Sequence, residues 1–165
     1  MTIANEAPAW LVAALLILLA LAAIEDGWRM RISNLLVLAI AATGIGAMVN
    51  AAIGWQAWEP LVAAAAILAV GTPLFARGWM GGGDVKLLSA SALWFMLDGS
   101  WRMLAAVAVS GGIVALIAIL MRLFRFSDAA RERVAMLQRG KGVPYGIAVA
   151  LGVAATVMGS RSGLI

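Results

Sequence analysis

Six apolar segments, separated by short polar or glycine-rich stretches, dominate the chain. A membrane-crossing helix needs about 20 residues, within a range of about 17–25, and most of these segments reach that length with their flanks. The pattern therefore predicts an all-α polytopic membrane protein with about six transmembrane helices. The segments are Ala9–Ile24, Leu35–Ile53, Leu61–Ala76, Val85–Leu97, Met103–Leu120 and Val143–Met158.

The fourth segment, Val85–Leu97, is too short to cross a membrane by itself. Its 13 residues give about 20 Å of helix at 1.5 Å per residue, against a hydrocarbon core of about 30 Å. Either the helix extends as far as Trp101, or the glycines before it enter the membrane without regular helix, in a protein-lined dip. The run Gly81-Gly82-Gly83 favours the second option, because glycine adopts backbone conformations that other residues avoid.

The first segment could be mistaken for a signal peptide. No Lys or Arg precedes Arg29, so the positive region with which a signal peptide begins is missing. We expect residues 8–24 to be a retained span.

Composition supports the membrane assignment and narrows the chemistry. The chain is 64% hydrophobic and contains no Cys and no His, which excludes thiol nucleophiles, Cys/His zinc sites and histidine bases. Acid–base chemistry must come from Asp, Glu, Lys, Arg or the single Tyr145, and we expect no metal or other cofactor.

Basic residues predict the orientation. Ten of the twelve lie in the loops that follow the first, third and fifth segments. The positive-inside rule places these loops in the cytoplasm and both termini outside it. In the longest loop, 121–142, apolar residues recur at helical spacing, which predicts an amphipathic helix on the cytoplasmic leaflet.

Two aspartates reach the same membrane face in this topology. Asp26 follows the first segment and Asp84 precedes the fourth. Two carboxyl groups brought close together share a proton, so one can activate water while the other protonates a carbonyl oxygen. Each also has a structural alternative, because Asp26 could pair with Arg29 or Arg31 in a solvated loop and Asp84 could cap a helix.

The other acidic residues are less suited to this chemistry. Glu6 and Glu59 belong to the opposite face in this topology. Four more are interpreted as surface charges: Glu25, Asp98, Asp128 and Glu132.

Three motifs together resemble the type IV prepilin peptidases. The run Gly81-Gly82-Gly83-Asp84-Val85-Lys86-Leu87 is similar to the GxGD motif of that family. The run Asp26-Gly27-Trp28-Arg29-Met30-Arg31-Ile32-Ser33-Asn34 resembles its other aspartate motif, and Val143-Pro144-Tyr145-Gly146-Ile147-Ala148 resembles its Pro-Tyr-Gly segment. The motifs occur in family order and cover nearly the whole chain, residues 1–165, which we interpret as a single domain.

The resemblance implies a bacterial inner-membrane aspartic endopeptidase that removes a short basic leader from prepilins at the cytoplasmic face. Asp26 and Asp84 would be the catalytic pair, and Gly81 and Gly83 would shape the backbone around Asp84. The expected partners are a prepilin or pseudopilin substrate and the lipid bilayer, with no nucleic acid. Supporting roles are implied for Lys86, Pro144, Tyr145 and Gly146.

The chain departs from the family pattern in two respects. Ser33 stands where the family usually has Pro, which we expect to loosen the turn before the second segment. Larger members carry a Cys-rich N-terminal domain and also methylate the pilin; this chain shows neither the domain nor Cys, so we expect peptidase activity alone. The compact form is similar to peptidases of tight-adherence (Tad/Flp) pilus systems, while archaeal preflagellin peptidases share the motifs.

Two other functions fit parts of the pattern. A proton-coupled carrier would also contain intramembrane acids and helices interrupted by glycine. A non-enzymatic pilus-assembly factor would use both aspartates only structurally.

Overall fold

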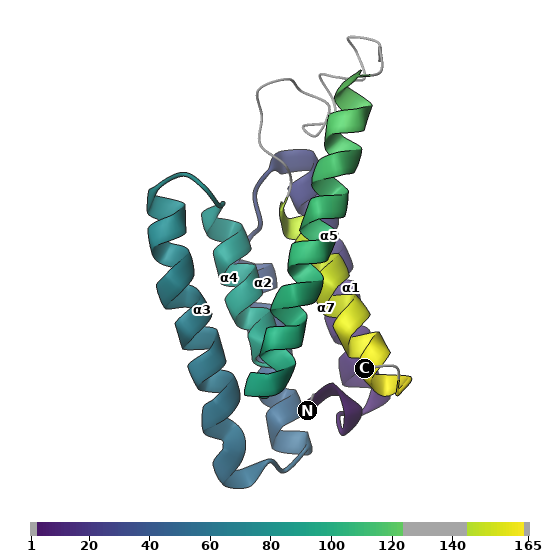
Figure 1. Ribbon diagram of the computed structural model, residues 1–165. Helices are drawn as coiled ribbons and strands as arrows, with labels where there is room; N and C mark the ends of the chain where they lie inside the picture. Colours follow the sequence, from purple (N-terminus) through teal and green to yellow (C-terminus); the bar gives the residue numbers. More distant parts are fainter. Residues whose placement is uncertain (1–2, 124–144, 164–165) are drawn as a thin grey trace.

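The computed structural model describes residues 3–123 and 145–163, which form an all-helical bundle (Figure 1). The all-α prediction is confirmed, and each of the six apolar segments corresponds to one helix. Pro144 and the amphipathic helix predicted for 121–142 lie outside the described residues, except that 121–123 continue α5. The elements are η1 (Ile3–Asn5), α1 (Ala9–Arg29), α2 (Asn34–Asn50), η2 (Gly54–Ala57), α3 (Trp58–Ala76), α4 (Gly82–Ala92), α5 (Leu97–Leu123) and α7 (Tyr145–Arg161).

Three of the described helical segments are long and apolar enough to cross a membrane. They are Ala9–Arg29, Gly54–Ala76 and Leu97–Met121, whereas α2 and α7 are apolar but shorter. Successive helices run in opposite directions, so η1 and the end of α7 lie at the same end of the bundle (Figure 1). The Arg161 guanidinium donates a hydrogen bond of 3.5 Å to the Ala7 carbonyl at this end.

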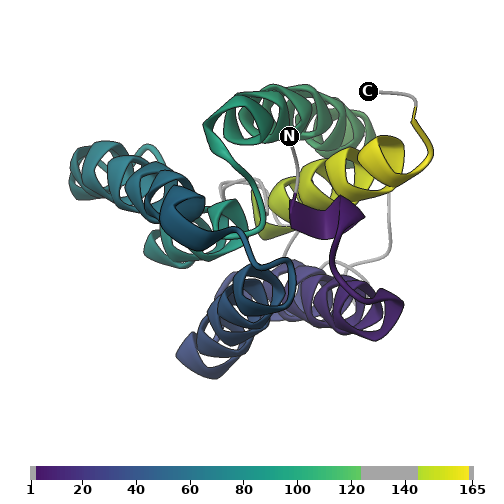
Figure 2. The same cartoon turned by 90° about the horizontal axis from the view of Figure 1, so that it is seen from below.

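The fourth apolar segment does not extend as a helix to Trp101. Helix α4 ends at Ala92, and α5 begins at Leu97 after a tight turn. Trp94 and Phe95 in this turn are fully buried, and the Trp94 carbonyl accepts a hydrogen bond of 3.1 Å from the Ile3 N–H. The chain therefore compensates for a short helix by packing the turn and η1 beneath it. Seen along the bundle, α4 lies among α2, α3 and α7, while α3 stands at the edge (Figure 2).

Glycines set the closest helix contacts. A Cβ on Gly152 of α7 would lie 2.6 Å from the Val107 Cα of α5, and a Cβ on Gly44 of α2 would lie 2.8 Å from the Leu93 Cβ. The Ser110 hydroxyl donates a hydrogen bond of 2.7 Å to the Ala148 carbonyl between α5 and α7. Small residues at such positions let helix backbones approach in a membrane, where apolar burial drives association only weakly.

The contact between Gly152 and Val107 gives a stability prediction. Replacing Gly152 with Ala forces two helix backbones apart, and overpacking of this kind costs about 1–3 kcal/mol. We expect Gly152→Ala to lower the unfolding temperature of the purified protein in detergent. Gly112→Ala is the matched control, because a Cβ at Gly112 meets nothing within 4 Å; equal unfolding temperatures for the two variants would contradict the prediction.

Candidate active site

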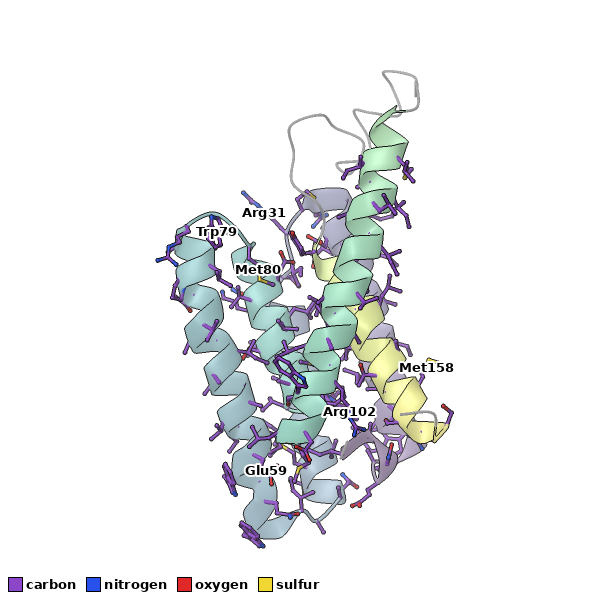
Figure 3. All side chains as sticks on the ribbon, in the orientation of Figure 1. Arg31, Glu59, Trp79, Met80, Arg102 and Met158 are labelled. Carbon is purple, nitrogen blue, oxygen red and sulfur yellow. The ribbon has the colours of Figure 1, made fainter. Side chains whose placement is uncertain are left out.

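Five chain segments meet at one end of the bundle. They are the end of α1, the start of α2, the turn between α3 and α4, the start of α4 and the start of α7. Figure 3 shows Arg31, Trp79 and Met80 at this end and Glu59 and Arg102 toward the opposite end. The segments that carry the three sequence motifs are thereby brought together.

Asp26 lies in the last turn of α1 and is held by α7. Its side chain is buried, and its Oδ2 accepts a hydrogen bond of 2.8 Å from the Gly146 N–H. The Ile147 N–H donates to the same carboxylate. These amides belong to the first turn of α7, where N–H groups lack partners within the helix and favour a negative charge.

Asp26 is not the solvated partner of an arginine. Among the described residues Arg29 makes its ion pair with Glu25, at 3.9 Å, and Asp26 points into the bundle. That alternative interpretation is wrong, because the carboxylate has left solvent and obtains its hydrogen bonds from backbone amides.

Gly146 is required by this arrangement. A Cβ at position 146 would lie 2.8 Å from the Asp26 Oδ2 and 2.9 Å from its Cγ. Any larger residue would therefore displace the carboxylate that α7 holds.

Asp84 lies in the first turn of α4 but is not its N-cap residue. Gly81 occupies the N-cap position, and the Gly81 N–H donates back to the buried Asp84 carboxylate. This is the half of a capping box in which the third helical residue binds the N-cap amide.

The glycines before Asp84 do not adopt unusual backbone conformations. Gly81 has φ −70° and ψ 140°, and Gly82 and Gly83 belong to α4 itself. The expectation of an irregular, non-helical stretch is wrong. Two of these glycines are required because there is no room for a side chain. A Cβ on Gly81 would lie 2.6 Å from the Asp84 Oδ2, and a Cβ on Gly83 would lie 3.2 Å from the Ile32 Cβ.

The two carboxyl groups line one pocket of about 250 Å³. Burial raises the pKa of Asp84 to about 7, with the negative charge of Asp26 adding to the rise and the Gly81 N–H opposing it. Such a pair can hold one proton near neutral pH, which is the state needed to activate water and protonate a carbonyl at once. The remaining lining residues are Met30, Gly78, Trp79, Met80, Gly81 and Tyr145.

Lys86 lies outside this pocket and connects two motifs. Its Nζ donates a hydrogen bond of 3.1 Å to the Asn34 Oδ1, so it joins the start of α4 to the start of α2. Together with the contact between Gly83 and Ile32, this bond fixes the α1–α2 connection against the helix that carries Asp84.

Ser33 does not loosen the turn before α2. Its N–H donates a hydrogen bond of 2.9 Å to the Glu25 Oε2, and its hydroxyl accepts one of 3.4 Å from the Leu36 N–H at the helix start. Its φ of −68° is the value to which proline is restricted, but proline has no N–H to donate. The expectation is therefore wrong, and Glu25 is a partly buried anchor of this turn as well as an ion-pair partner.

Four residues that line the pocket were not among the site residues predicted from the sequence: Met30, Gly78, Trp79 and Met80. Trp79 and Met80 directly precede the glycines, and their position was the available signal. Met30 ends α1 with a left-handed φ of 53°, a conformation that side-chain type does not reveal. Among the described residues, no group of three or more His, Cys, Asp or Glu side chains could hold a metal ion.

Comparison with known proteins gives a family match that contains the two aspartate motifs. Neither the curated proteins nor the solved structures contain a match to the chain. The sequence model of the type IV leader peptidase family matches residues 13–121, which is more than half of the chain and includes both Asp26 and Asp84. The chain therefore belongs to the type IV leader peptidase family.

Proposed function

We propose that this protein is a membrane-embedded aspartic endopeptidase that removes the short basic leader of Flp-like type IV prepilins. The observation that carries the proposal is the shared pocket of Asp26 and Asp84, two buried carboxyl groups from α1 and α4, in a chain of a peptidase family. Aspartyl chemistry needs neither His nor Cys, and the sequence contains neither.

In the proposed reaction Asp26 is the base and Asp84 is the acid. Asp26 accepts hydrogen bonds from two α7 amides, whereas Asp84 accepts one, from the Gly81 N–H. The negative charge is therefore better stabilised on Asp26 and the shared proton is assigned to Asp84. Asp26 takes a proton from water as the water oxygen bonds to the scissile carbonyl carbon, and Asp84 gives its proton to the carbonyl oxygen. The C–N bond then breaks as the nitrogen takes the proton from Asp26, and an O–H proton of the intermediate returns to Asp84.

The bundle end that carries the pocket is proposed to face the cytoplasm. Arg29, Arg31, Arg77 and Lys86 lie in the helix ends and connections at this end, as the positive-inside rule requires of cytoplasmic loops. Six crossings would then place both termini on the extracytoplasmic side. The pocket lies at one end of the bundle rather than at its centre, which disfavours a carrier with a midplane site.

Asp26→Asn and Asp84→Asn test the pair directly. General acid–base catalysis contributes about 10²–10⁴-fold, so we expect each variant to lose prepilin processing by at least about 100-fold while remaining folded and inserted. Leader removal from a co-expressed prepilin is followed by gel mobility, with the exposed Asp98→Asn as the control. Normal processing by either pocket variant would rule out the aspartyl mechanism.

Gly146→Ala tests whether α7 positions Asp26. The added methyl group displaces the Asp26 carboxylate, and a misplacement of about 1 Å can cost about 100-fold in rate. We expect a loss of that order in prepilin cleavage by the purified enzyme, at an unchanged level of inserted protein. Gly111→Ala, whose Cβ would lie 3.8 Å from the Ala148 Cβ, serves as the control, and full activity of Gly146→Ala would show that this contact is dispensable.

The pH profile tests the protonation state. Because the pKa of Asp84 is raised to about 7, the acid is protonated below that pH and is lost as the pH rises through it. We expect kcat/KM to fall about tenfold per pH unit on the alkaline side, with an apparent pKa near 7. Cleavage by the enzyme in proteoliposomes is measured between about pH 5 and about pH 9, and a flat profile across this range would contradict the assignment of Asp84 as the acid.

A further inference from the structure

A second pocket, of about 310 Å³, opens beside α4 and is lined only by apolar residues and one glycine. We call it the lateral groove. Its walls come from α3, α4 and α5, and Figure 2 shows α3 and α5 on either side of α4. The α3 residues Ala66, Val70 and Leu74 line it at four-residue intervals, so it follows α3 for about 12 Å at 1.5 Å per residue.

The lateral groove adjoins the aspartate pocket. Met80 lines both, and Figure 3 shows it in the turn that precedes α4. Val85, the residue after Asp84, also lines the groove. A chain segment that leaves the two carboxyl groups along α4 would therefore run past Met80 and Val85 to the apolar groove.

The α4 wall of the lateral groove is buried and closely packed, whereas part of its α3 wall is exposed. Val85 and Leu88 on α4 are buried, and Val85 packs directly on Gly71 of α3. Val70, by contrast, is 67% exposed. Exposed apolar surface that adjoins a polar pocket is typical of a binding site for an amphiphilic partner.

From this geometry we propose that the lateral groove binds the part of the prepilin that follows the scissile bond, presented to the apolar lining as an apolar helix. The proposal rests on the proposed peptidase function. Side chains recurring every three or four residues on a substrate helix match the four-residue spacing along α3. The charged leader would lie outside the groove, which lacks polar lining residues, and the scissile bond would lie between the two, beside Met80.

Disulfide cross-linking tests the proposal, because the chain contains no Cys. Ala66→Cys places a thiol in the groove, and Ala65→Cys places one on the adjacent exposed position that does not line it. Each is combined with Asp84→Asn, which retains uncut substrate, and with a prepilin that carries single cysteines along its apolar segment. After oxidation in membranes, we expect Ala66→Cys to form disulfides with substrate positions that are spaced by three or four residues. Ala65→Cys is expected not to form these disulfides.

Other outcomes identify other occupants. A disulfide between two copies of Ala66→Cys would assign the groove to a second copy of the chain. If Ala66→Cys forms no disulfide with the substrate, the groove is assigned to lipid acyl chains. If Ala65→Cys cross-links to the substrate in the same amount as Ala66→Cys, the substrate has no preference for the groove. Each of these results overturns the proposal.

A kinetic comparison separates failure of the groove from failure of the enzyme. Ala66→Trp fills the groove, and we expect it to lower kcat/KM for a prepilin roughly tenfold or more, the scale on which apolar pockets discriminate. Ala65→Trp should cleave like the wild type. Unchanged cleavage by Ala66→Trp overturns the groove proposal and leaves the peptidase intact, whereas absence of cleavage by the wild type overturns the proposed function itself.

Discussion

The hydrogen bond between the Gly146 N–H and the Asp26 carboxylate, at 2.8 Å, is the contact on which the rest of the site depends. It joins residues 120 positions apart and ties the first helix to the last. A buried carboxylate is costly without donors, and the free amides at the start of α7 provide them. This contact explains why α1 ends beside α7, why position 146 is glycine, and why Asp26 faces the same pocket as Asp84.

The short helix α4 depends on its neighbours for its position. Its first turn carries Asp84, Lys86 connects it to Asn34 of α2, and the buried Trp94 follows its last turn. Ser89 donates a hydrogen bond of 2.8 Å to the Ala64 carbonyl of α3. A helix held on several sides in this way can present a carboxylate at a fixed depth and still leave one apolar side open toward the membrane.

Properties that depend on a single stretch of chain follow from the sequence, whereas those that arise from packing do not. The six apolar segments became six helices, because hydropathy and length act over a single stretch of chain. Helix α4 ends before the apolar segment does, since the turn around Trp94 and Phe95 is stabilised by burial rather than by local propensity. The glycines before Asp84 were correctly singled out but for the wrong reason, as they provide space for Ile32 and the Asp84 carboxylate rather than unusual dihedral angles.

The sequence by itself determined the all-helical membrane class and the absence of Cys and His chemistry, and it singled out the two aspartates that line one pocket, because each follows from residue type and spacing. Only the tertiary structure decided that α7 amides hold Asp26, that Glu25 and Ser33 anchor a turn, and that Met80 lines both the aspartate pocket and the lateral groove. The physical reason is that these contacts join residues distant in sequence. Hydrogen-bond donors, open space and exposed surface at such points exist only after the helices have packed.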